Sequence, residues 1–108
     1  MEIRESEKYY IITPLSPKLG ARESSRIGEE IAENTKKIGI DMSFVQDCTI
    51  DFINQLVNFK NVSLFNISSD IFAILTSMNL DKSVPLFVSE IDFIDDRHQL
   101  LNRKFTLI

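Results

Sequence analysis

The sequence predicts one α/β domain over residues 1–108, with a mixed, mostly parallel β-sheet of about four to five strands and about four helices packed mainly on one face. Segments with strand-like alternation recur along the chain, and segments with helical periodicity separate them. The 108 residues fit a single domain, and the sequence shows no internal repeat or linker. Strands that alternate with helices in this way pair in parallel, which gives the fold class.

The composition argues against several classes of protein. A hydrophobic fraction of 44% and a charged fraction of 26% indicate a globular chain rather than a disordered one. The formal net charge of -4 argues against a nucleic acid partner. The first residues are charged, unlike a signal peptide, and no apolar run approaches the roughly 20 residues of a membrane span. With a single cysteine as well, we expect a cytoplasmic, bacterial-style protein without direct membrane insertion.

The first third of the chain predicts two strands and a helix. Residues 1–6 are expected to contain an edge strand, antiparallel to a second strand at residues 9–13, where aromatic and β-branched residues cluster. Two prolines and a glycine in residues 14–20 predict the most mobile loop. Residues 21–36 predict a surface helix, although a serine cap at residues 24–25 would start it later. Two of its residues are expected to face inward: Ile27 and Ile31.

The central stretch, residues 37–56, predicts a buried strand, a short polar loop and a second helix. Apolar residues alternate with small or polar ones from Ile38 to Met42. The first turn of the helix is expected to carry Asp47, Cys48 and Thr49, beside the free N–H groups and positive dipole of its N-terminus. Its apolar face is expected to consist of Ile50, Ile53, Leu56 and Val57, widened by Phe52 and Phe59. Such strand-to-helix junctions often carry function in α/β proteins.

The second half of the chain predicts two more strands and two more helices. A strand at residues 62–67 precedes a helix capped by residues 68–70, and Asn79 is expected to end that helix in a left-handed conformation. Residues 85–88 predict another strand, and its proline suits either the first residue of a strand or a sheet edge. Ser89 is then expected to cap the last helix. The expected buried residues of the two helices are Ile71, Ile74, Leu75 and Met78, then Ile91, Phe93, Ile94, Leu100 and Leu101.

Three segments resemble one known family in their order and spacing. Residues 38–43 are similar to a hydrophobic strand that ends in Asp-Leu-Ser, and residues 47–49 to an Asp-Ser-Ser segment. Residues 64–75 with residues 78–82 are similar to a strand, a helix and a Gly-Leu-Asp-Lys ending. In these three segments the chain resembles the STAS domain family, which is named for sulfate transporters and anti-sigma factor antagonists. The resemblance implies a STAS-like fold and a protein-binding role.

The sequence departs from this family where its members are phosphorylated. Cys48 takes the place of the serine that is phosphorylated in anti-sigma factor antagonists. Thr49 is the remaining hydroxyl, and a phosphate there would add about 1.5–2 negative charges beside Asp47 and Asp51. An alignment without a gap instead places Ile50 at the acceptor position, which leaves no hydroxyl there. Two roles for Thr49 therefore stay open: regulated phosphorylation, and capping of the following helix.

Signs of an enzyme are weak. A helix N-terminus lowers the pKa of a thiol, but two neighbouring carboxylates raise that of Cys48, so we expect a structural cysteine. Asp41, Asp47 and Asp51 suggest a magnesium site, yet no glycine-rich cradle for a substrate phosphate is present. The single histidine, His98, is expected at the surface rather than in a catalytic triad. We therefore expect no enzyme, no cofactor and no metal.

The resemblance implies a module that docks an anti-sigma factor of the ATP-using serine kinase type. The expected contact residues are Asp41, Ser43, Asp47, Cys48, Thr49, Asp51, Asn54 and Gln55. A second hypothesis is a non-catalytic subunit of a lipid or sulfate transporter complex, which suits the missing serine. A third, a thiol or carboxylate hydrolase, depends on Cys48 and the aspartates alone. The strand-like residues 104–108 would pair within the chain or across a homodimer.

Overall fold

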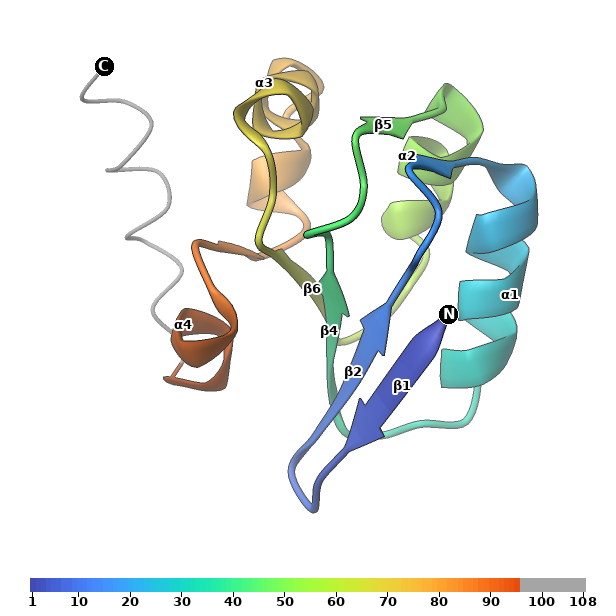
Figure 1. Ribbon diagram of the computed structural model, residues 1–108, viewed down its shortest axis with the longest axis vertical. Helices are drawn as coiled ribbons and strands as arrows, with labels where there is room; N and C mark the ends of the chain where they lie inside the picture. The colour runs from blue at the N-terminus through green and yellow to red at the C-terminus, as the bar shows by residue number, and fades with distance from the viewer. Residues whose placement is uncertain (96–108) are drawn as a thin grey trace.

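Five strands form the central sheet of the computed structural model, in the order β1-β2-β4-β6-β7 (Figure 1). β1 (Glu2–Glu5) lies at one edge and runs antiparallel to β2 (Tyr9–Thr13). β4 (Lys37–Asp41), β6 (Val62–Phe65) and β7 (Leu86–Phe87) follow, each parallel to its neighbour. The predicted mixed, mostly parallel sheet is therefore confirmed.

The structure describes residues 1–95. The predictions for His98, Leu100, Leu101 and residues 104–108 lie outside the described residues.

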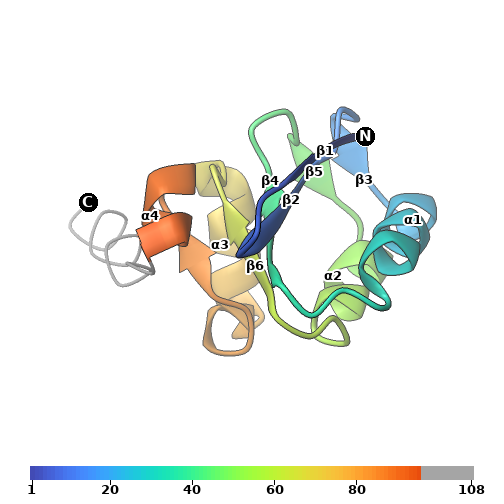
Figure 2. The ribbon, with the colours of Figure 1, turned by 90° about the horizontal axis from the view of Figure 1, so that it is seen from below.

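Three helices cover one face of the sheet and a fourth covers the other. α1 (Ala21–Ile31), α2 (Ile50–Leu56) and α3 (Ser69–Ser77) each lead into the next parallel strand, and η1 (Leu80–Lys82) is a 3-10 turn before β7. Since these crossovers advance across the sheet in one direction and share one hand, their helices lie on the same face of the sheet. α4 (Glu90–Asp95) lies on the opposite side from α1 and α2 (Figure 2). The α/β, STAS-like architecture matches the fold class that the sequence predicts.

The alternation in β4 divides its residues between two apolar clusters. Ile38 and Ile40 belong to the large cluster beneath α1, α2 and α3. Gly39 lies on the other face, where Phe93 of α4 packs on Phe65 and Phe87 with ring centroids 5.4 and 5.6 Å apart. Both faces of this strand are thus buried, and the glycine makes room for the α4 aromatic ring.

Polar contacts from two strands hold α4 on its face of the sheet. Arg4 of β1 forms an ion pair with Glu90, and the Lys37 ammonium donates a hydrogen bond to the backbone oxygen of Phe93. The same ammonium lies 5.1 Å from the ring centroid of Phe87 and 4.6 Å from that of Phe93. A cation above two aromatic faces adds to the apolar packing of α4.

Three predicted helix boundaries that depend on local capping are confirmed: those at Ser68, Asn79 and Ser89. The Ser68 hydroxyl accepts a hydrogen bond from the Ile71 N–H at 3.2 Å, as an N-cap does. Asn79 ends α3 with a φ of 60°, the left-handed conformation that asparagine tolerates. Ser89 accepts a bond from the Asp92 N–H at 3.4 Å at the start of α4.

In the first third of the chain, the predicted start of α1 is confirmed, but its predicted end is wrong. α1 ends at Ile31 rather than at residue 36, because Asn34 accepts a hydrogen bond from the Lys36 N–H at 2.9 Å and forms a turn there. The helix begins at Ala21, as predicted, and not at the alternative serine cap, because the Glu23 carboxylate accepts a bond from the Gly20 N–H at 2.7 Å. The loop expected to be most mobile contains β3 (Lys18–Leu19), which pairs in parallel with β5 (Asp47–Cys48).

Candidate functional site

The predicted site lies at the edge of the sheet that is formed by the C-terminal ends of the parallel strands β2 and β4 (Figure 1). The expectation that Asp47, Cys48 and Thr49 form the first turn of α2 is wrong, because α2 begins at Ile50. Asp47 and Cys48 form β5, and the Thr49 N–H continues this pairing by donating to the Leu19 oxygen at 2.8 Å. The segment is therefore held extended against β3.

Thr49 is the N-cap of α2, so the capping role is confirmed. Its hydroxyl oxygen accepts a hydrogen bond from the Phe52 N–H at 3.2 Å, and its side chain is half-buried. Such a cap contributes about 1 kcal/mol to stability. Phosphorylation of Thr49 stays a prediction.

The buried face of α2 matches the predicted one in part. Phe52, Ile53 and Leu56 are buried as predicted, whereas Ile50 is 67% exposed and Val57 is 49% exposed. The spacing of the apolar residues therefore predicts a wider buried stripe than the helix has. Once the extended segment before the helix fixes its orientation, Ile50 lies in solvent beside the predicted site.

Asp41 is buried beneath the same edge and connects two of its loops by hydrogen bonds. The residue is only 9% exposed, and one oxygen of its carboxylate accepts three hydrogen bonds: from the Ser43 N–H at 3.0 Å, the Ser43 hydroxyl at 2.6 Å and the Asn66 side-chain amide at 3.1 Å. Asn66 holds a left-handed φ of 57° at the end of β6. Asp41 thus ties the loop after β4 to the loop after β6, while Ser43 above it is exposed.

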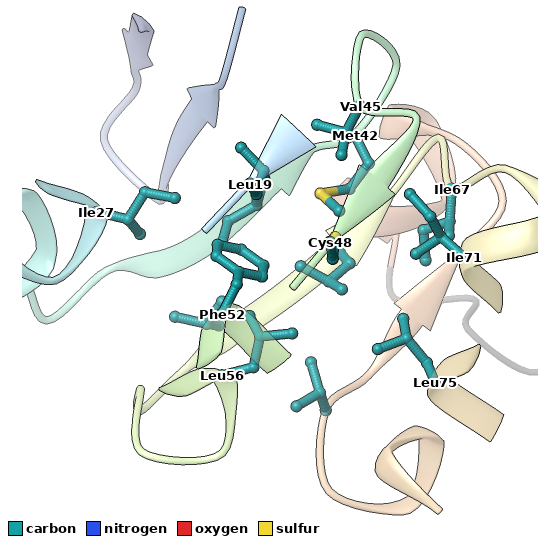
Figure 3. Close-up of a cluster of buried hydrophobic side chains, with 14 of the residues drawn as sticks. Leu19, Ile27, Met42, Val45, Cys48, Phe52, Leu56, Ile67, Ile71 and Leu75 are labelled. Carbon is teal, nitrogen blue, oxygen red and sulfur yellow. The ribbon is translucent and has the colours of Figure 1, made fainter. Parts of the chain in front are cut away.

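Cys48 lies in the apolar cluster beneath this edge. Figure 3 shows its side chain among those of the large cluster, with Phe52 on one side and Ile71 on the other. Burial, with a smaller contribution from the negative charge of Asp47, raises the pKa of the thiol to about 12. The expectation of a structural cysteine agrees with this burial, because the thiol is protonated and unreactive at neutral pH.

We expect Cys48 to resist iodoacetamide at neutral pH and to react once urea unfolds the chain. Because the pKa rises from 9.0 to about 12 on folding, the folded state favours the neutral thiol. The resulting stability is complete below pH 9 and is lost as the pH rises towards 12. Intact-mass measurement after alkylation, with and without urea, tests this. Rapid alkylation of the folded chain at pH 7 would contradict it.

The remaining predicted contact residues are exposed and form two groups. Ser43 and Asp47 lie at the edge of the sheet. Asp51, Asn54 and Gln55 line a groove of about 580 Å³ between α2 and α1. The structure does not place all predicted residues on one surface, since Asp41 and Cys48 are buried.

Two residues of this edge were missed by the sequence reasoning. Phe44, between Ser43 and Val45, is 56% exposed, although its neighbour Val45 is buried. An aromatic residue in a polar loop just after a strand was the available signal. Asn66 lies 25 positions from its partner Asp41, and no sequence pattern links the two.

Within residues 1–95, no group of three or more histidine, cysteine, aspartate or glutamate side chains is placed to hold a metal ion. No helix in that part of the chain is both long enough and apolar enough to cross a bilayer.

Comparison with known proteins yields a likeness in fold. No family model matches the chain, and no curated protein matches it. Among solved structures, the chain is similar to murine Solute Carrier 26 family member A9 (Slc26a9), an anion transporter in its inward-facing state, with a TM-score of 0.65 and 19% identity. The likeness supports a STAS-like fold. It covers 90% of this chain but only 18% of the transporter chain, and at this identity it shows the fold alone.

Proposed function

We propose that this STAS-like domain is a regulatory module that docks a partner protein through the edge formed by Phe44, Asp47 and Ile50. The observation that carries the proposal is the exposure of these three side chains, two of them large and apolar, around a segment held extended by the pairing of β5 with β3. Exposed apolar groups beside a charge are typical of protein interfaces.

The same edge supports a role in binding rather than in catalysis. The groups with reactive chemistry are engaged in the fold: the Cys48 thiol is buried with a raised pKa, and the Thr49 hydroxyl caps α2. The buried Asp41 carboxylate accepts hydrogen bonds from Ser43 and Asn66. The exposed groups that we assign to docking, Phe44, Asp47 and Ile50, are two apolar side chains and a charge, which suit recognition. We therefore propose that the domain is not an enzyme.

Two kinds of partner follow from different observations. The resemblance of residues 38–43 and 47–49 to anti-sigma factor antagonists favours a partner of the anti-sigma factor, serine kinase type. The likeness in fold to an anion transporter favours the second candidate, a transporter complex in which the domain is a non-catalytic subunit. Genes that neighbour the coding sequence would discriminate between a kinase with a sigma factor and a transporter.

Asp47→Lys is expected to weaken partner binding at least tenfold. The substitution reverses an exposed charge at the centre of the proposed contact, and each loss of about 1.4 kcal/mol lowers affinity tenfold. The tagged chain is used to recover a partner from its source cells, the partner is identified by mass spectrometry, and its affinity is measured with purified proteins by calorimetry.

Glu7→Lys is the matched control. Glu7 is also exposed and lies in the turn between β1 and β2, at the opposite end of β2 from the proposed contact. The same change of charge there is expected to leave the affinity within twofold. Equal affinities of the two folded variants would rule out docking through Asp47.

A further inference from the structure

A small pocket opens between α1 and the loop that follows β2. Its volume is about 100 Å³, and its apolar lining consists of Met1, Pro14, Leu15 and Ile27. Pro14 and Ile27 are buried, whereas Leu15 is 54% exposed, so the pocket reaches from the surface down to the core. We call it the Leu15 pocket.

The Leu15 pocket lies at the same edge of the sheet as the proposed docking residues. β2 ends directly before the loop that forms one wall of the pocket, and β4 ends at the same edge. In this loop the Pro17 oxygen accepts hydrogen bonds from the Gln46 N–H at 2.7 Å and from the Asp47 N–H at 3.1 Å. These two bonds hold the loop that carries Leu15 beside the segment that carries Asp47.

The volume of the pocket limits what can enter it. Pockets for small-molecule ligands usually measure about 300–1,000 Å³. An engineered cavity of about 150 Å³ holds one benzene molecule. At about 100 Å³, the Leu15 pocket fits a single aliphatic side chain, such as that of leucine or valine, and is too small for the indole of tryptophan. Burial of one such anchor in a pocket is a common source of affinity in protein interfaces.

The rim of the pocket carries a cation that forms no ion pair with residues 1–95. This residue is Arg26, which is exposed. Glu23 also lines the pocket, but its carboxylate accepts a hydrogen bond from the Gly20 N–H at 2.7 Å, and the positive end of the α1 dipole offsets its charge. Arg22, one helical turn before Arg26, is exposed and also makes no ion pair in the described part of the chain. The local charge therefore favours an acidic group beside the apolar anchor.

From this arrangement we propose that the Leu15 pocket receives one aliphatic side chain of the partner protein, from a segment in which an acidic residue lies next to it. The aliphatic group packs between Leu15 and Ile27, and the acidic group pairs with Arg26. Such a segment extends the contact beyond Asp47 along the same edge of the sheet. The inference rests on the proposed function and deepens it by naming the residue types that are recognised.

The first test is an NMR titration of the full chain, labelled at its leucine and isoleucine methyl groups, with the blocked tripeptide Asp-Leu-Asp. The titration runs to about 20 mM, because one buried side chain gives millimolar affinity at best. The methyl signals of Leu15 and Ile27 are expected to shift. Serine in place of the leucine is expected to abolish these shifts, and tryptophan in its place to weaken binding at least fivefold. Asparagine in place of both aspartates is expected to weaken binding at least threefold.

Two substitutions with matched controls test the protein side of the contact. Arg26→Glu is expected to weaken tripeptide binding at least fivefold, because it reverses the charge at the rim. Lys60→Glu changes the net charge equally, just before β6 at the opposite edge of the sheet, and is expected to leave the affinity within twofold. Leu15→Asp is expected to abolish binding. Its control is Ile91→Asp on α4, where the parent side chain is 64% exposed, and the affinity is again expected to stay within twofold.

Several outcomes would overturn the inference. Unshifted Leu15 and Ile27 signals at the highest concentration would do so, as would equal binding of the leucine, serine and tryptophan tripeptides. A dimer in sedimentation that Leu15→Asp dissociates would assign the pocket to a second copy of the chain instead. If the natural partner loses affinity with Asp47→Lys but not with Leu15→Asp or Arg26→Glu, the proposed function stands and this inference fails.

Discussion

Phe52→Ala is expected to lower the free energy of unfolding by about 3–5 kcal/mol, a large fraction of the total for a domain of this size. Phe52 is fully buried and lies in the large cluster near Leu19 and Cys48 (Figure 3). Alanine would leave a cavity beneath β3 and β5, the two strands that hold the candidate site in place. Urea denaturation followed by circular dichroism measures the change.

Ile50→Ala is the control in the same helix. Ile50 is apolar and two residues from Phe52, but it is exposed, so its loss is expected to change stability by no more than about 0.5 kcal/mol. Similar losses for the two variants would show that the orientation of α2 is wrong.

Gly39→Ala is expected to lower the free energy of unfolding by about 1–3 kcal/mol through overpacking. A Cβ atom at this position would lie 2.8 Å from Cζ of Phe93 and 2.9 Å from Cε1 of Phe65, so the α4 ring would have to move away from the sheet. Denaturation curves give the loss, and the near-ultraviolet dichroism of the aromatic cluster is expected to change with it.

Phe93→Leu provides the decisive second variant, because it removes the ring that a Cβ at Gly39 would strike. In that background Gly39→Ala is expected to cost at least about 1 kcal/mol less than in the parent chain, which is a coupling of the usual size for residues in contact. Additive losses would contradict the close packing of α4 on this strand.

The parts of the fold that the sequence predicts are those with local causes. The alternation from Ile38 to Ile40 follows from the period of two along a strand, which directs both isoleucines to one face of β4 and Gly39 to the other. The cap at Ser68 and the left-handed Asn79 each depend on the intrinsic preference of one residue and its near neighbours. Such signals do not require knowledge of distant contacts.

The parts that the sequence does not predict depend on contacts between distant residues. The pairing of Leu19 with Cys48 joins two segments too short to show a strand period, yet it delays the start of α2 to Ile50. That delay makes Thr49 the cap and exposes Ile50, which changes the composition of the candidate site. The bond between Asp41 and Asn66 is similarly non-local.

Recognition of a protein through the exposed edge around Asp47 can be tested with a single ratio. The most direct measurement is the ratio of the partner dissociation constants of Asp47→Lys and Glu7→Lys, determined side by side by calorimetry on folded proteins. We predict a ratio of ten or more, because the two variants share their net charge and differ in where it is placed. A ratio near one would contradict it.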